Sequence, residues 1–114
     1  MVAIIDYDAG NIRSVEKAVS LLGEDVKVTR ERGEILSADH IILPGVGAFG
    51  DAMEKLRSYG LTEVIEEAVG EGIPFLGICL GLQLLFESSE ESEGVKGLGI
   101  LPGRIVRLPE APGL

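Results

Sequence analysis

Short, unbroken apolar runs, separated by stretches of helical periodicity, constrain the fold of this chain more than any other feature. Val2–Ile5 is apolar at every position and stops at Asp6, and His40–Leu43 ends in three aliphatic residues before a Pro-Gly pair. Such runs are typical of strands buried on both faces, as in a parallel sheet. Two more short strands are predicted at Val26–Val28 and Pro74–Leu76.

Helical patterns fill the intervals between these strands. The first helix is predicted from Asn11, placed as its N-cap, to Gly23, with apolar residues spaced three or four positions apart. Two more helices are predicted at Asp51–Ser58 and Leu61–Val69. Strands joined by helices of this length require right-handed crossovers. The sequence therefore predicts one α/β domain over residues 1–114, with a parallel sheet and helices on both faces.

The C-terminal third gives weaker signals. The acidic, serine-rich stretch Glu87–Glu93 is predicted to be a solvated loop. Short strands are expected at Gly97–Ile100 and Arg104–Leu108, where several prolines limit regular structure.

Composition excludes several classes of function. The formal net charge is −9, which repels nucleic acid and anionic membranes. No apolar run approaches the roughly 20 residues that span a bilayer. The single cysteine cannot form an internal disulfide, and no Cys/His cluster predicts a metal site. We therefore expect a cytoplasmic protein without a metal or cofactor, binding neither nucleic acid nor membrane.

That single cysteine, Cys79, lies within Gly77-Ile78-Cys79-Leu80-Gly81, where the last predicted strand meets a helix. A residue on such a sharp turn projects its side chain above the sheet, and flanking glycines remove the Cβ atoms that would clash. The pattern predicts a nucleophile. The alternative is that Cys79 is a small buried hydrophobic residue, as most single cysteines are.

A second glycine cluster, Gly45-Val46-Gly47-Ala48-Phe49-Gly50, matches the dinucleotide-binding pattern G-x-G-x-x-G. We interpret this match as false, because the cluster does not follow the first strand and the acidic residues about 20 positions later fall within a helix. Its backbone N–H groups are expected beside Cys79, where they could bind an oxyanion. The competing interpretation is a glycine turn that only permits close packing.

A thiolate nucleophile normally needs a base, and the only histidine is His40. It begins its strand, whereas Cys79 follows the end of another. In a parallel sheet these positions lie at opposite edges, so His40 is predicted to be a structural or surface residue.

Four segments carry a resemblance that covers essentially the whole chain. They are Asp6–Asn11 with Ser14 and Val15, Leu43–Phe49, Gly77–Phe86, and Gly97-Leu98-Gly99 before Pro102-Gly103. In this order and spacing they resemble the class I (triad) glutamine amidotransferases, and within that family the glutaminase subunits of imidazole glycerol phosphate synthase. The resemblance implies a flavodoxin-like sheet that is incomplete at the C-terminus of this chain.

The resemblance also implies a chemistry. Cys79 would attack the side-chain amide of glutamine, form a glutamyl thioester and release ammonia, without a cofactor. The backbone N–H of Leu80 and that of Val46 or Gly47 would form the oxyanion hole, the latter after a peptide rearrangement. Gln83 and Gly45 would help to bind the substrate.

The implied partner is a (β/α)8-barrel cyclase subunit, which would use the ammonia in histidine biosynthesis. Asn11 and Ser14 would lie at the docking face, although helix capping alone also explains both residues. Asp8 departs from the family, which usually has glycine there. The family's catalytic histidine and glutamate would fall beyond Leu114, so we expect negligible glutaminase turnover by this chain alone.

Three other interpretations remain open at this stage. The chain could be a docking fragment without chemistry, or a glutaminase subunit that serves another ammonia acceptor. It could also be a different cysteine hydrolase, because several folds share a nucleophile elbow.

Overall fold

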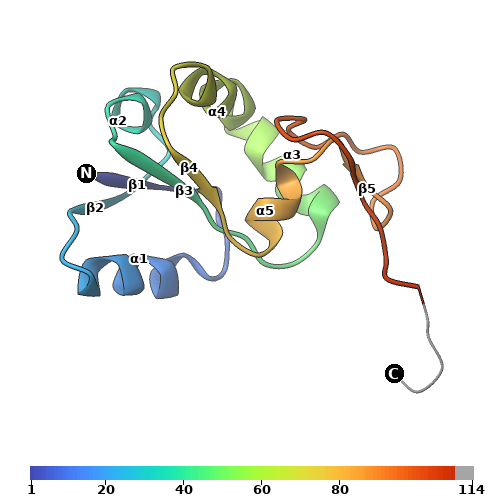
Figure 1. Ribbon diagram of the computed structural model, residues 1–114, viewed down its shortest axis with the longest axis horizontal. Helices are drawn as coiled ribbons and strands as arrows, with labels where there is room; N and C mark the ends of the chain where they lie inside the picture. The colour runs from blue at the N-terminus through green and yellow to red at the C-terminus, as the bar shows by residue number, and fades with distance from the viewer. Residues whose placement is uncertain (110–114) are drawn as a thin grey trace.

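The computed structural model describes residues 1–109, in which four parallel strands form a central sheet between helices (Figure 1). The strands are β1 Val2–Ile5, β2 Val26–Thr29, β3 His40–Leu43 and β4 Phe75–Gly77. The helices are α1 Ile12–Leu21, α2 Arg32–Leu36, α3 Phe49–Ser58, α4 Leu61–Gly70 and α5 Leu80–Leu84. A separate two-stranded sheet pairs β5 Ser88–Ser89 with β6 Arg104–Ile105. The predicted α/β architecture is confirmed.

The central sheet has the strand order β2-β1-β3-β4, with every pair parallel. β1 is therefore an interior strand and is buried at all four positions, whereas β4 lies at an edge and is only partly buried. The carboxyl ends of parallel strands meet at one edge of a sheet. The turns after β1, β3 and β4 consequently lie near one another.

Helices cover the two faces of the sheet unequally. One face packs against α2, α3, α4 and α5 in a large core that includes Ile5, Leu43 and Phe49. The other face carries Val2, Ile4 and Ile42, which pack against Val15 of α1. No helix in residues 1–109 combines the length and the apolar character needed to cross a membrane.

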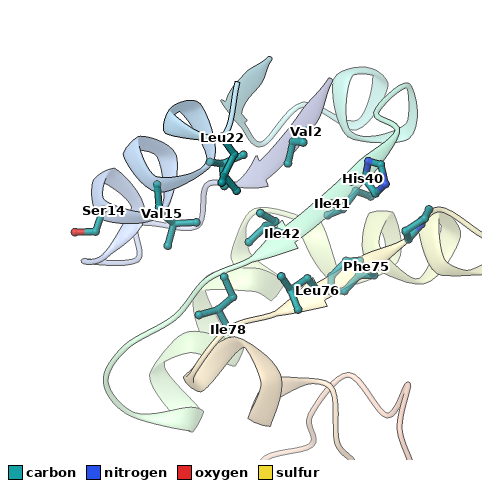
Figure 2. A pocket seen from close by; sticks show the side chains of 13 residues that line it. Val2, Ser14, Val15, Leu22, His40, Ile41, Ile42, Phe75, Leu76 and Ile78 are labelled. Carbon is teal, nitrogen blue, oxygen red and sulfur yellow. The ribbon is translucent and has the colours of Figure 1, made fainter. Parts of the chain in front are cut away.

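α1 leaves a groove beside β3 and β4, which we call the α1 groove (Figure 2). It has a volume of about 510 Å³, and most of its lining side chains are apolar. Leu22 at the end of α1 is 79% exposed and Leu76 of β4 is 55% exposed. This face of the sheet is thus the part that residues 1–109 cover least.

The pattern of apolar residues in the sequence predicted most helices and strands, with errors of one or two residues at their ends. β1 and β3 have the predicted bounds, β2 extends one residue further, and β4 is shifted by one residue. Helix α2 was not predicted. It has five residues and only Ile35 is buried, so it shows no helical repeat of apolar positions.

Two expectations for the C-terminal third are wrong. Ser88 and Ser89 form a strand within the predicted solvated loop, and Ser89 is buried. The predicted strand at Gly97–Ile100 is absent. Its N–H groups instead donate to carbonyls at the C-terminal end of α5 and just after it, with Leu98 donating to Leu84 at 2.8 Å and Gly99 to Phe86 at 3.1 Å. This segment therefore satisfies acceptors that the end of a helix leaves unpaired.

The start of α5 packs directly on the end of β3. A Cβ atom on Gly81 would lie 1.9 Å from the carbonyl oxygen of Leu43, and one on Gly77 would lie 2.7 Å from the Cα of Leu82. Both obstacles are backbone atoms, which cannot move aside without disturbing the sheet or the helix. Glycine at these two positions is what allows the strand and the helix to meet so closely.

Asp8 anchors the turn after β1. Its backbone has φ of 68°, in the left-handed region that favours glycine. The carboxylate accepts hydrogen bonds from the Tyr59 hydroxyl and from Arg30, and Lys55 lies 3.5 Å away. These contacts, the Tyr59 hydrogen bond foremost, lower the pKa of Asp8 below its ordinary value. Arg30 also stacks over the Tyr59 ring at 3.9 Å.

Gly81→Ala should destabilise the protein by about 3 kcal/mol, because the new methyl group has no space against the β3 backbone. Urea unfolding followed by circular dichroism measures this loss. Gly70→Ala is the matched control: Gly70 ends α4 with no atom within 4 Å of its Cβ position. That substitution should leave stability unchanged or raise it by up to about 1 kcal/mol. Equal effects of the two substitutions would contradict the packing described for α5.

Asp8→Asn should lower the free energy of unfolding at neutral pH, and this loss of stability should be smaller at acidic pH. The folded state lowers the pKa of Asp8, so its ionised form stabilises the fold above the unfolded pKa, and this contribution disappears as the pH falls through the folded pKa. The gap in urea midpoint between the two proteins should begin to close as the pH falls toward about 4, the ordinary pKa of aspartate, and should disappear once Asp8 is protonated in the folded state. Glu54→Gln, an exposed position within α3, is the control. A gap of constant size would contradict this role for Asp8.

Candidate active site

Cys79 occupies a strained turn between β4 and α5. Its backbone has φ of 55° and ψ of −122°, a combination that residues other than glycine rarely adopt. Strain of this kind costs of order 1–3 kcal/mol and concentrates at functional sites. The thiol is free and exposed. The alternative of a buried structural cysteine is therefore wrong.

The segment Pro44–Ala48, which we call the glycine loop, lies beside the start of α5. Gly45 is buried, and a Cβ atom there would lie 2.9 Å from the backbone nitrogen of Gly81. Val46 and Gly47 are exposed, and Gly47 has φ of 98°. The structure thus brings the two predicted glycine motifs together at the edge of the sheet where Cys79 lies.

The candidate oxyanion donors do not converge in this conformation. The N–H of Leu80 donates a hydrogen bond of 3.2 Å to the carbonyl oxygen of Gly45. The peptide that joins Gly45 to Val46 is trans, so its N–H points opposite to its C=O. Because that C=O faces Leu80, the Val46 N–H points away from it. An oxyanion could reach both donors only after this peptide turns.

Gln83 lies one helical turn after Cys79, and its N–H approaches the Cys79 carbonyl oxygen at 3.4 Å. Its side chain lines a cavity of about 490 Å³, which we call the Gln83 pocket. The other lining residues come from β5, β6 and the segments next to them, and they are Ser89, Glu90, Glu91, Ile105, Val106 and Arg107. The pocket therefore offers carboxylates and a guanidinium beside a primary amide.

Sequence reasoning gave no role to Glu90, Glu91 and Arg107, which line the Gln83 pocket. Glu90 and Glu91 belong to the stretch interpreted as a solvated loop, and Arg107 to a predicted strand. The pairing of β5 with β6 brings them together, and the Arg107 N–H donates to a Glu90 carboxylate oxygen at 2.7 Å. Two strands of two residues each leave no periodic signal in a sequence.

His40 does not belong to this site. It is exposed at the amino end of β3 and pairs with Val2, the first residue of β1. Cys79 follows the carboxyl end of β4. The two residues therefore lie at opposite edges of the sheet, as predicted.

Asn11 and Ser14 lie at the start of α1, which follows the carboxyl end of β1. Asn11 occupies the predicted N-cap position, but its side chain makes no capping hydrogen bond. Its buried Oδ1 atom has no hydrogen-bond partner within residues 1–109. Ser14 is exposed at one end of the α1 groove, with His40 toward the other end (Figure 2).

Over nearly the whole length of this chain, about half of the aligned residues are identical in several curated relatives. Imidazole glycerol phosphate synthase subunit HisH of Listeria innocua is 50% identical over 99% of the chain and 54% of its own length. The same-named proteins of Moorella thermoacetica and Methanocaldococcus jannaschii are 56% and 52% identical, over 95% and 100% of the chain. The chain spans about half the length of these relatives.

Comparison of structures gives the same architecture. A crystal structure of a glutamine amidotransferase superposes with a TM-score of 0.78 at 24% identity, over 94% of this chain and 57% of that one. A likeness at this identity establishes the fold alone. The family model for glutamine amidotransferase class-I matches residues 3–106. Since that match covers both glycine motifs, Cys79 and most of the chain, the chain belongs to the class-I glutamine amidotransferase family.

Proposed function

We propose that this chain is the nucleophile-bearing part of a glutaminase subunit of imidazole glycerol phosphate synthase. The observation that carries the proposal is the strained, exposed Cys79 between β4 and α5, with the glycine loop beside it. The names of relatives about 50% identical support the choice of synthase. In this proposal the chain is one partial domain of a cytoplasmic enzyme, and its free exposed thiol suits a reducing compartment.

Cys79 Sγ attacks the side-chain carbonyl carbon of glutamine, and the carbonyl oxygen becomes an oxyanion. Collapse of this intermediate breaks the C–N bond, and the nitrogen leaves as ammonia after it gains a proton. Water then attacks the resulting glutamyl thioester, which releases glutamate and restores the thiol.

The oxyanion hole forms when the Gly45–Val46 peptide turns. The turn withdraws the Gly45 carbonyl oxygen from the Leu80 N–H and brings the Val46 N–H round to the same side. Both N–H groups then donate to the oxyanion, and Gly47 provides the freedom that such a rotation needs. A donor of this kind is worth about 3–4 kcal/mol to the transition state.

The Gln83 pocket binds the amino-acid part of the substrate. Free glutamine carries an ammonium, a carboxylate and a primary amide. Glu90 or Glu91 pairs with the ammonium, Arg107 with the carboxylate, and Gln83 both donates and accepts hydrogen bonds. Support comes from the lining of the pocket, which joins both signs of charge one helical turn from Cys79.

The base comes from outside residues 1–114. His40 is the only histidine of the chain and lies at the opposite edge of the sheet. We assign the proton transfers to a further part of the protein, consistent with relatives about twice as long as this chain.

Asn11 and Ser14 contribute to the face that docks a (β/α)8-barrel cyclase subunit. The relatives are named as subunits of a synthase, which supports a protein partner. The exposed Ser14 and the unpartnered buried Oδ1 of Asn11 support this position for the contact. A docking fragment without chemistry makes the same contact, so activity and binding have to be measured separately.

The 114-residue chain should hydrolyse glutamine at least about 100-fold more slowly than the complete Listeria innocua relative, because general acid–base catalysis contributes about 10²–10⁴ in rate. Ammonia release, measured with a coupled dehydrogenase, gives the comparison. Cys79→Ser sets the background rate. Steady turnover by the chain at the relative's rate would overturn our assignment of the base.

Ser14→Arg should weaken binding of the chain to a purified cyclase subunit by about tenfold or more, because a large, unpaired charged side chain within an interface costs about 1.4 kcal/mol or more. Isothermal titration calorimetry measures the change. Ser20→Arg is the matched control, since Ser20 is also exposed but lies near the other end of α1. Equal binding by the parent and by both variants would show that Ser14 does not lie at the docking face.

A further inference from the structure

Tyr7 links the turn after β1 to Pro44, the first residue of the glycine loop. Its side chain is only 3% exposed. The hydroxyl donates a hydrogen bond of 2.5 Å to the carbonyl oxygen of Pro44, which is 37 residues away in sequence. Pro44 is itself fully buried, so this carbonyl depends on Tyr7 for a partner.

The same hydroxyl closes the space over the next residue. A Cβ atom on Gly45 would lie 2.5 Å from the Tyr7 oxygen. The hydroxyl therefore fixes the Pro44 carbonyl and excludes any side chain at Gly45. Burial raises the pKa of Tyr7 to about 12, so the group remains a donor throughout the neutral range.

Two consecutive peptides of the glycine loop are thus held by different donors. The Pro44–Gly45 peptide is held through its carbonyl by the Tyr7 side chain, and the Gly45–Val46 peptide through its carbonyl by the Leu80 N–H. Formation of the oxyanion hole requires release of the second hydrogen bond only. The first can remain in place throughout.

We infer that Tyr7 is a positioning residue for the oxyanion hole. Its hydroxyl keeps the Pro44–Gly45 peptide stationary while the Gly45–Val46 peptide turns, so that the turn ends with the Val46 N–H directed to the side of Cys79. This inference rests on the proposed function. Without the anchor, the rotation spreads over both peptides and the Val46 N–H no longer has a defined end position.

The surroundings of Val46 support this division between fixed and moving parts. Gly10 belongs to the same turn as Tyr7, and its Cβ position lies 3.5 Å from the side chain of Val46. Val46 is 53% exposed, and nothing lies within 4 Å of the Cβ position of Gly47. The glycine loop is therefore held in place at Pro44 by the Tyr7 hydroxyl, whereas Val46 and Gly47 have open space around them.

Tyr7→Phe isolates the hydroxyl, because the ring remains in the core. Tyr59→Phe is the matched control: it removes the other tyrosine hydroxyl of the chain, which bonds Asp8 in the same turn. The first readout is amide hydrogen exchange of the 114-residue chain, measured by NMR. In Tyr7→Phe, exchange of the Leu80 amide, which donates to Gly45, should rise at least tenfold more than exchange of core amides in α3 and β1. Tyr59→Phe should not produce this local increase.

A second readout links the hydroxyl to the chemistry of Cys79. A chloroketone analogue of glutamine needs the oxyanion hole to alkylate Cys79, whereas iodoacetamide needs only the thiolate. Tyr7→Phe should lower the ratio of the two alkylation rates by tenfold or more and leave the iodoacetamide rate within twofold. Tyr59→Phe should leave the ratio unchanged.

The possible results separate the two proposals. A parent chain that shows no preference for the chloroketone would count against the proposed function, and the exchange data would then decide the role of Tyr7 alone. A uniform rise in exchange across the chain, or equal effects of the two tyrosine variants, would overturn the positioning role and leave Tyr7 as an ordinary core residue.

Discussion

The contact between Gly81 and the Leu43 carbonyl is the constraint on which the site depends. α5 begins so close to the end of β3 that no side chain fits between them. The chain must therefore turn sharply after β4, and Cys79 takes a backbone conformation with positive φ at that turn. Burial of Leu80 and Leu84 in the core holds α5 in place and offsets this strain. The exposed thiol beside the glycine loop is a consequence of backbone packing.

The features of this site that the sequence predicted are those that depend on residues adjacent in the chain. β1 and β3 are continuous apolar runs, and Cys79 lies between glycines two positions away on either side, so local pattern located both strands and the elbow. The hydrogen bonds that organise the loop join residues far apart in sequence: Leu80 to Gly45, and Tyr7 to Pro44. Nothing in either segment alone signals these pairs. The Gln83 pocket escaped prediction for the same reason, because it depends on the pairing of β5 with β6.

The sheet has one well-covered face and one partly covered face. Within residues 1–109, four helices pack over the first face and α1 alone packs over the second, which leaves the α1 groove open beside β3 and β4 (Figure 2). Of the two elements that form the elbow, α5 packs against the well-covered face, whereas Leu76 of β4 lines the α1 groove. The chain spans about half the length of its relatives, and it contains both the Cys79 turn and the glycine loop.

The central claim is that Cys79 is a nucleophile beside a pocket that recognises glutamine. The most direct test is to label the chain with a chloroketone analogue of glutamine and to map the adduct by mass spectrometry, with and without competing amino acids. Our account predicts one adduct, on Cys79, whose formation is slowed in a saturable manner by L-glutamine and not by D-glutamine. Labelling that L-glutamine does not slow, or no adduct on Cys79, would contradict it.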